Sequence, residues 1–324
     1  MSSPVPDTAA LIQRLQQASG ILLITHVSPD SDAIGSLLGL AHALRAQGKT
    51  VTPSCADAIR DRFAMLPGHA AVVTQAAGPF DLVVALDCGD ELRLGAVWTN
   101  LPDPKPFLIN IDHHISNTRF GQINWVDPAA ASTAEMVLQL TDRMGAPFSQ
   151  DIAICLLYGI VGDTLGFRTP NTTARQLQYA ERCMEAGASL HDSIDYQFNR
   201  RSQALVCLWG KALSATRIKD RVAYAAVSKA MRDACGVDSA DLGLSSFLVS
   251  MNEVDRAAVL VEKDDHRVEI SLRAKRGYNV SDAAVALGGG GHALAAGATI
   301  GGPLNSAVKQ VLQALKQHAT RQAP

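Results

Sequence analysis

The sequence predicts an α/β protein in which a parallel sheet with helices on both faces is followed by a second, smaller α/β domain. Three observations indicate this fold class. Short apolar runs alternate with longer segments of helical periodicity through the first half of the chain, as in parallel sheets. The apolar runs are nearly continuous, which is typical of strands buried on both faces. The length of 324 residues fits two average domains.

The elements of the first half can be placed in order. The first predicted strand covers residues 21–26, "ILLITH". A helix is predicted over 33–47, because apolar residues from Ile34 to Leu44 recur at helical spacing and Gly48 occupies a C-cap position. We expect further strands over 50–55, 81–88 and 106–112, and further helices over 132–144, 150–161 and 172–186.

The second half resumes the alternation after a mostly helical region at 187–218. The last predicted helix is amphipathic, with the sequence "LNSAVKQVLQALKQHA". We expect strands over 221–228, 256–263, 266–275 and 298–302, and helices over 229–235, 239–250, 280–287 and 304–319. The predicted division is a first domain at 1–190, a linker at 191–219 and a smaller domain at 220–324.

The composition indicates an ordinary globular chain, with 47% hydrophobic residues, 19% charged residues and a net charge of −2. This balance argues against a basic surface for long nucleic acid and against a polybasic membrane-binding segment. The six cysteines are widely spaced without a CxxC pair, so we expect buried thiols in a reducing compartment. No signal peptide or membrane-spanning run is seen, and a cytoplasmic location is predicted.

Acidic and histidine side chains gather where predicted strands and helices end, which is where parallel sheets place their chemistry. A single aspartate at such a position is often a helix N-cap. Capping needs one acceptor at each helix start, however, and does not explain a His-x3-Asp-x-Asp run together with three further clusters. The residues are His26, Asp30, Asp32, Asp87, Asp112, His113, His114 and Asp163.

Carboxylates and imidazoles suit hard or borderline divalent ions such as Mn²⁺ or Mg²⁺. Five aspartates and three histidines are more than one ion needs and about right for two. Two ions that share a carboxylate, ~3.5–4 Å apart, can clamp a phosphoryl group and activate water. Pro29 keeps Asp30 out of a helix interior. The sequence therefore predicts a two-metal site at the end of the first strand.

The run "DHH" at 112–114, with "HVSPDSDAIGS" before it and Asp87 and Asp163 around it, resembles the DHH phosphoesterase superfamily. The segment 271–300, "SLRAKRGYNVSDAAVALGGGGHALAAGATI", is similar to the DHH-associated C-terminal domain, whose GGGH loop binds the substrate. These motifs span nearly the whole chain in the family's order. The resemblance implies a dinuclear, usually manganese, centre and an active site in the cleft between the two domains.

The resemblance also implies a role for each matching position. Asp87 would bridge the two metal ions. His114 would face the scissile phosphate as a charge stabiliser or proton donor, and Asp112 would orient a histidine. The implied ligands are His26, Asp30 and Asp87 for one ion, and Asp32, Asp87, His113 and Asp163 for the other.

In the second domain, the resemblance implies that Arg273 and His292 bind the substrate's other phosphate or its terminal nucleotide. The glycines of the loop would let the backbone approach the ligand closely. They are Gly289, Gly290 and Gly291.

Length and charge favour the two-domain branch that resembles nano-RNases, which are bifunctional oligoribonucleases and 3′-phosphoadenosine-5′-phosphate phosphatases. The expected substrates are oligonucleotides of about two to five nucleotides, such as pApA and pGpG, or a nucleotide bisphosphate; long nucleic acids are not expected. Hydrolysis of a cyclic dinucleotide such as cyclic di-AMP is the alternative within the class. The alternative from another class is a non-catalytic nucleotide sensor. A homodimer is plausible by family analogy.

Overall fold

The apolar runs of the first half form one parallel sheet. This computed structural model describes residues 8–59, 63–237, 243–263 and 266–318, and the chain divides into two units, Met1–Arg200 and Arg201–Pro324. The strands of the first unit are β1 (Gly20–Thr25), β2 (Thr50–Ser54), β3 (Leu82–Leu86), β4 (Phe107–Asp112) and β5 (Ile123–Val126). In the described part of this unit they lie in the order β2-β1-β3-β4-β5, and each neighbouring pair is parallel.

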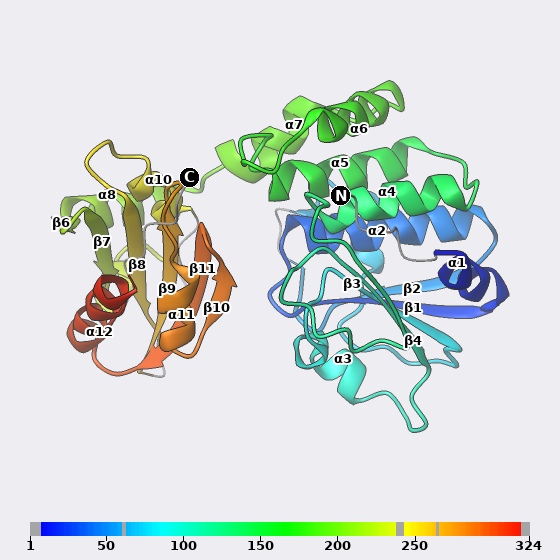
Figure 1. Cartoon of the computed structure of the whole chain (residues 1–324), viewed down its shortest axis with the longest axis horizontal. Coiled ribbons are helices and arrows are strands. Elements are labelled where there is room, and N and C mark those ends of the chain that lie inside the picture. The colour runs from blue at the N-terminus through cyan, green and yellow to red at the C-terminus, as the bar shows by residue number, and fades with distance from the viewer. Residues whose placement is uncertain (1–7, 60–62, 238–242, 264–265, 319–324) are drawn as a thin grey trace. The chain divides into compact units, whose positions relative to one another are not determined.

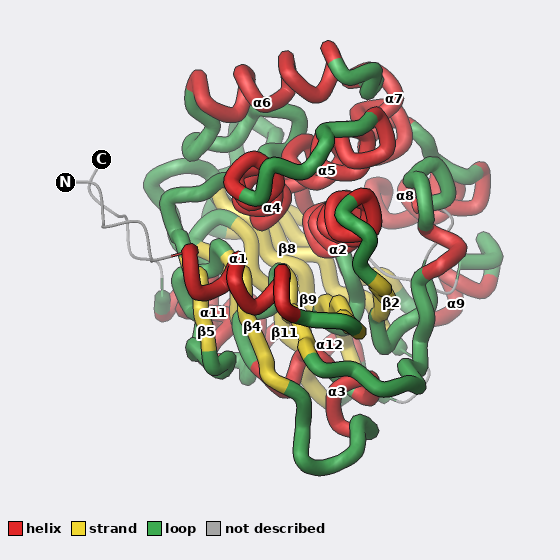
Figure 2. Tube along the Cα trace, turned by 90° about the vertical axis from the view of Figure 1, so that its right-hand side faces the viewer, coloured by secondary structure: helices red, strands yellow, loops and turns green. Residues whose placement is uncertain are grey.

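Helices cover both faces of this sheet, as the sequence predicts. On one face, α2 (Ser31–Ala46), α4 (Thr133–Arg143) and α5 (Gln150–Asp163) pack against one another (Figures 1 and 2). The other face is covered by the 3-10 helix η3 (Glu91–Leu94) and by α3 (Ala96–Thr99) (Figure 1). The remaining helices among the described residues of this unit are α1 (Thr8–Gln17), η2 (His69–Ala71), α6 (Ala174–Glu185), α7 (Leu190–Ile194) and the π-helix η4 (Asp195–Asn199).

Successive side chains of each strand enter two different apolar cores, because strand residues alternate between the faces of a sheet. Leu23 and Val84 are fully buried in the core beneath α2, α4 and α5. Leu22 and Val83, their neighbours in the chain, are buried in the opposite core with Trp98. The sheet interior is thus apolar on both sides, and the polar groups lie where the strands end.

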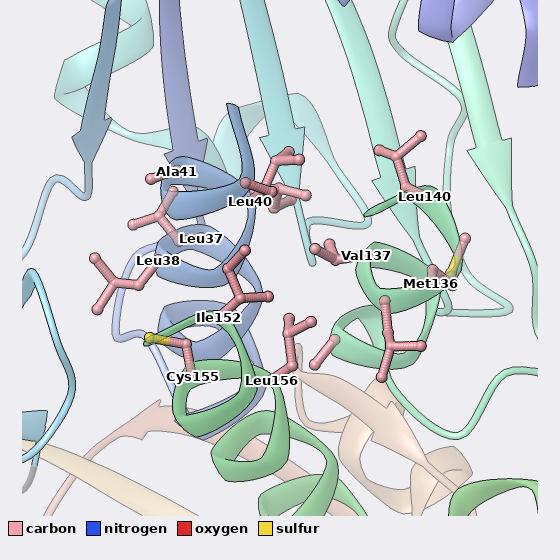
Figure 3. Packing of buried hydrophobic residues seen from close by; sticks show 14 of the residues in the cluster. Leu37, Leu38, Leu40, Ala41, Met136, Val137, Leu140, Ile152, Cys155 and Leu156 are labelled. Atoms are coloured by element: carbon pink, nitrogen blue, oxygen red, sulfur yellow. The ribbon is translucent and has the colours of Figure 1, made fainter. Parts of the chain in front are cut away.

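The larger core is closed by contacts among the three helices. Figure 3 shows Leu40 of α2, Val137 of α4 and Leu156 of α5 packed within it, and all three are fully buried. The backbones approach closely: a Cβ at Gly35 of α2 would lie 2.6 Å from the carbonyl oxygen of Cys155. Close packing of α2 on α5 sets the distance between the residues that follow β1 and those that end α5.

Several elements of this unit lie outside the sequence prediction: helix α1, strand β5 and the short helices η2, η3 and α3. Two of them, α1 and β5, show the reason. Helix α1 buries only Leu11 and Leu15, four residues apart, so its periodic signal is short. Strand β5 has four residues, of which Trp125 and Val126 are buried, and it forms by pairing in parallel with β4. Both elements depend on a partner that is distant in sequence rather than on a strong local pattern.

The second unit is a smaller α/β domain with a mixed sheet, which confirms the predicted class. Among its described residues, six strands lie in the order β10-β11-β9-β8-β7-β6, and the pair β7–β8 is parallel while the others are antiparallel. The strands are β6 (Arg217–Lys219), β7 (Val222–Val227), β8 (Arg256–Glu262), β9 (Arg267–Ala274), β10 (Gly290–His292) and β11 (Ala295–Gly301). The helices are α8 (Gln203–Ser214), α9 (Lys229–Asp233), α10 (Leu244–Val249), α11 (Ser281–Ala286) and α12 (Leu304–Gln317).

Some predicted segments differ in detail. The predicted linker at 191–219 contains helical segments of both units, and the division between the units falls at Arg200. The predicted domain boundaries themselves stay a prediction. The glycine-rich loop contributes a short strand, β10, and residues 239–242 of the predicted helix 239–250 lie outside the described residues.

The prediction of six thiols is wrong for two of them. Cys207 of α8 and Cys235, which follows α9, form a disulfide with their Cα atoms 5.8 Å apart. Their separation of 28 residues gives no sequence signal, because only the packing of α8 beside α9 brings them together. The four free cysteines, which are all buried, are Cys55, Cys88, Cys155 and Cys183.

No described helix combines the length and the apolar character that a membrane crossing requires.

Candidate metal centre

Four chain segments end at one place in the first unit. His26 follows β1, and Asp30 begins α2 by accepting hydrogen bonds from the N–H groups of Asp32 and Ala33. Asp87 follows β3 in a left-handed backbone conformation, with φ of 56°. A non-glycine residue in this region is strained, and such strain concentrates at functional sites. Asp112 to His114 follow at the end of β4, and Asp163 is the last residue of α5.

The ligand atoms of these residues form three overlapping groups, and the atoms of each group lie within 4.8 Å of one another. Asp87 belongs to two of the groups and His113 to two. The groups are His26, Asp30 and Asp87; Asp32, His113 and Asp163; and Asp87, His113 and His114.

Asp87 stands between two histidines and turns one oxygen toward each. Its Oδ2 lies 3.6 Å from Nε2 of His26, and its Oδ1 lies 3.6 Å from Nε2 of His113. His26 also faces Oδ2 of Asp30 at 3.9 Å. The Asp87 carboxylate is 1% exposed and faces two separate imidazoles. A carboxylate that bridges two metal ions would have this geometry.

His113 lies close to both carboxylates of the second group. Its Nε2 lies 3.1 Å from Oδ2 of Asp163 and 3.9 Å from Oδ2 of Asp32. The remaining ring nitrogen, Nδ1, lies 3.4 Å from the carbonyl oxygen of Ala130. A hydrogen bond on Nδ1 leaves Nε2 as the nitrogen that can bind a metal.

The carboxylates influence one another's charge strongly. Burial raises the pKa of Asp32 well above its usual range, and the charge of Asp87 raises it further. Burial also raises the pKa of Asp163. Burial alone would raise the pKa of Asp87 as well, but the three histidines around it outweigh burial and hold that pKa well below its usual range. The lowered pKa favours the ionised form of the buried Asp87 carboxyl between its imidazoles.

The donor set fits divalent metal ions. It consists of carboxylate oxygens and imidazole nitrogens, which suit ions of Mn²⁺ or Mg²⁺ type. Three carboxylates from separate segments lie around a single imidazole, and a bound cation would offset their repulsion.

Asp112 is placed differently from the other acids. It is absent from the three ligand groups, and its Oδ1 lies 2.7 Å from Nδ1 of His114. The same oxygen accepts the N–H of His113, and Oδ2 accepts a hydrogen bond from Asn117. Asp112 is fully buried and fixes the ring of His114.

The beginning of α4 holds two of the carboxylates. The N–H groups of Thr133 and Ala134 donate to Oδ2 and Oδ1 of Asp32, at 2.5 and 2.8 Å. The hydroxyl of Thr133 donates to Oδ1 of Asp87 at 3.0 Å. Gly159 of α5 permits this approach, since a Cβ there would lie 2.9 Å from Oδ1 of Asp32.

In the second unit, the residues predicted to bind substrate share one row of the sheet. His292 of β10 pairs with Ala295 of β11, which pairs in turn with Arg273 of β9. Directly paired residues present their side chains on the same face of an antiparallel sheet. Arg273 donates through Nε to the hydroxyl of Ser246 at 3.3 Å.

The three glycines before His292 differ in their surroundings. A Cβ at Gly289 would lie 2.0 Å from the carbonyl oxygen of Gly297, so the β10–β11 pairing requires glycine there. Gly291 has φ of 136° and would meet Ala296 at 2.6 Å. A Cβ at Gly290 would meet no described atom within 4 Å. Packing thus explains two of the glycines and leaves the third unexplained.

Two family models and a curated relative match this chain along most of its length. The family model described as "DHH family, N-terminal domain" matches residues 20–160, and that of the DHHA1 domain matches residues 220–320. The bifunctional oligoribonuclease and PAP phosphatase NrnA of Thermus thermophilus is 36% identical, over 93% of this chain and 90% of that protein. The chain belongs to the DHH family.

Two further similar proteins extend the comparison. The protein of the same name from Bacillus subtilis is 26% identical, over 90% of this chain and 92% of that relative. The crystal structure of an exopolyphosphatase-related protein from Bacteroides fragilis superposes with a TM-score of 0.89 at 25% identity and covers 98% of each chain. Both comparisons extend along nearly the whole of this chain, across the DHH and the DHHA1 matches.

The DHH domain brings together all the acidic and histidine residues that the sequence singles out there, with Asp112 beside the ligand groups rather than in them. The predicted cleft between the domains stays a prediction. Sequence reasoning missed Thr133 and also Arg93, whose Nη2 lies 2.9 Å from Nδ1 of His26. The pattern Ser132-x-x-Glu135 predicts the start of a helix. It does not predict that this helix start donates hydrogen bonds to Asp32 and Asp87. Arg93 carried no sequence signal.

Proposed function

We propose that this DHH-family chain is a metal-dependent phosphoesterase that hydrolyses short oligonucleotides, such as pApA and pGpG, to mononucleotides. We extend the proposal to 3′-phosphoadenosine 5′-phosphate, with AMP as product. The observation that carries it is Asp87, whose two oxygens address His26 and His113 separately, as a carboxylate between two metal ions would. The names of the two NrnA relatives support the substrate class.

The proposed cofactor is a pair of divalent ions, with Mn²⁺ preferred to Mg²⁺. When bound, they would neutralise charge on the phosphoryl oxygens and activate a water for attack. His26, Asp30 and Asp87 would hold one ion, and the remaining ligands would hold the other with Asp87 shared. The second set is Asp32, Asp87, His113 and Asp163.

His114 would act on the substrate rather than on the metal. Its Nδ1 donates to the buried Asp112, so Nε2 is the nitrogen that would meet the phosphate or its leaving oxygen. Burial lowers the pKa of His114, but the Asp112 hydrogen bond and the charge of Asp87 raise it above its usual value overall. A protonated imidazole can stabilise negative charge and deliver a proton to the departing group.

The DHHA1 domain would bind the other end of the substrate. Arg273 offers a planar guanidinium that suits a phosphate, and His292 shares its row of the sheet. Gly290 would give the ligand close access to the backbone, because packing does not require a glycine there. A site that holds both ends of a dinucleotide favours short substrates over long ones.

The test is product analysis in the presence of Mn²⁺, with pApA, pGpG, a five-nucleotide RNA, 3′-phosphoadenosine 5′-phosphate and cyclic di-AMP. We expect rapid conversion of the linear dinucleotides to mononucleotides. Preferred cleavage of cyclic di-AMP would replace the proposal with a cyclic-dinucleotide phosphodiesterase. Binding of these nucleotides without product, under every metal tried, would identify a sensor instead.

A further inference from the structure

Arg93 lies beside the metal centre without being one of its acids or imidazoles. Its side chain is exposed, and Nη2 is 2.9 Å from Nδ1 of His26. The same Nδ1 is 2.8 Å from the carbonyl oxygen of Val27. A guanidinium only donates hydrogen bonds and a carbonyl only accepts them. Nδ1 can therefore satisfy Arg93 as an acceptor or Val27 as a donor, but not both at once.

Metal binding by His26 would decide between the two partners. The other nitrogen of His26, Nε2, faces Oδ2 of Asp87 and Oδ2 of Asp30, where a metal ion would be held. A ligating nitrogen carries no proton, so the proton of the neutral ring must then lie on Nδ1 and point to the carbonyl oxygen of Val27. In that state Nδ1 is a hydrogen-bond donor and cannot accept a hydrogen bond from Arg93. The contact with Arg93 and the binding of metal by His26 exclude each other.

The backbone keeps Arg93 at the rim of the centre when this contact breaks. Its carbonyl oxygen accepts the N–H of Val27 at 2.8 Å, which ties η3 to the end of β1. Its own N–H donates to the carbonyl oxygen of Asp90, whose side chain caps the same turn. Among the described residues, no carboxylate lies within 4.0 Å of the guanidinium. A guanidinium released from His26 therefore has no carboxylate within ion-pair distance in the described part of the chain.

We propose that Arg93 binds a phosphate oxygen of the substrate once metal ions occupy the centre. This inference rests on the proposed phosphoesterase function and adds a binding residue from the DHH domain itself. The chemistry is that of a guanidinium with a phosphoester anion, which forms short, charge-assisted hydrogen bonds in paired geometry. The Arg93 side chain would thus donate a hydrogen bond to His26 in the metal-free protein. In the metal-bound protein it would donate to the substrate phosphate instead.

Two binding measurements test this without turnover. The first titrates Mn²⁺ into substrate-free protein and follows the melting temperature. Arg93→Met should bind Mn²⁺ about two- to tenfold more tightly than the wild type, because a competing hydrogen bond to His26 is gone. Weaker Mn²⁺ binding by Arg93→Met would overturn the proposal, since Arg93 would then support the ligand instead of competing with it.

The second measurement titrates inorganic phosphate into protein loaded with Mg²⁺. Arg93→Met should bind phosphate roughly 10- to 100-fold more weakly, and Arg93→Lys should fall between it and the wild type. The control is Arg182→Met, which removes a guanidinium of α6 that pairs with Asp142 of α4, and it should match the wild type. Unchanged phosphate affinity in Arg93→Met would overturn the proposal.

Hydrolysis of pApA separates this inference from the proposed function. If the wild type turns over, Arg93→Met should raise KM more than it lowers kcat. If the wild type hydrolyses nothing while both binding shifts are seen, the phosphoesterase function fails and the phosphate-binding role of Arg93 stands.

Discussion

The hydroxyl of Thr133 donates a hydrogen bond to Oδ1 of Asp87 across 3.0 Å, and both groups are buried. The backbone N–H of the same residue donates to Asp32. One residue at the start of α4 thus fixes a carboxylate that follows β3 and another in the first turn of α2. Hydrogen bonds of this kind orient metal ligands, and their loss commonly costs about 10- to 100-fold in metal affinity or activity.

Thr133→Val should weaken Mn²⁺ binding by roughly tenfold, because it keeps the shape of the side chain and removes the donor to Asp87. The Mn²⁺ dependence of the melting temperature measures this. Thr141→Val is the matched control: Thr141 is also buried in α4, but its hydroxyl donates only within the helix, to the carbonyl oxygen of Val137. Equal Mn²⁺ affinities in the two variants would contradict a role for Thr133 at the centre.

Asp112→Asn should lower kcat on the order of 100-fold while Mn²⁺ affinity stays near that of the wild type. The amide keeps only one acceptor oxygen, so its NH2 group would face either Nδ1 of His114 or the amide donor of Asn117. Either placement weakens the hydrogen bonds that orient the His114 ring. Steady-state kinetics alongside a Mn²⁺ titration separates the two effects. Asp81→Asn is the control, because Asp81 also accepts backbone N–H groups but precedes β3. A loss of Mn²⁺ binding in Asp112→Asn would make Asp112 a ligand instead.

Gly290→Ala should leave the melting temperature unchanged and raise KM for pApA, because its Cβ meets no described atom within 4 Å and would occupy the space of the ligand. Gly289→Ala should instead lower the melting temperature, because its Cβ would lie 2.0 Å from the carbonyl oxygen of Gly297. Thermal unfolding and KM measured together distinguish these cases. An unchanged KM in Gly290→Ala would remove the glycine run from substrate binding.

Gly159→Ala should destabilise the DHH domain by about 1–3 kcal/mol, because its Cβ would lie 2.6 Å from Cβ of Ala134 and 2.9 Å from Oδ1 of Asp32. It should also weaken Mn²⁺ binding by displacing Asp32. Gly210→Ala, in α8 with open space around it, should stabilise the protein by about 0.5–1 kcal/mol. Chemical denaturation measures both signs. A neutral Gly159→Ala would show that α4 and α5 can separate without cost.

The ends of the strands could be predicted from the sequence because each buried apolar run stops at a polar residue. The site could be predicted because the carboxyl ends of parallel strands meet at one edge of the sheet. His26 and Asp87 could be chosen on that basis, and Asp163 because it ends a buried helical run. Thr133 and Arg93 could not, because their roles depend on the approach of α4 to α2 and of η3 to β1. The disulfide and strand β5 could not be predicted for the same reason. Each depends on a contact between segments that tertiary packing brings together.

The most direct test of the two-metal account is hydrolysis of pApA by the wild type and by Asp87→Ala, each with a chelator and with added Mn²⁺. The account predicts mononucleotide product from the wild type only when Mn²⁺ is present. It predicts a rate at least about 1,000-fold lower for Asp87→Ala, since both ions would lose a shared ligand. Near-wild-type turnover by Asp87→Ala, or full activity in the presence of the chelator, would contradict it.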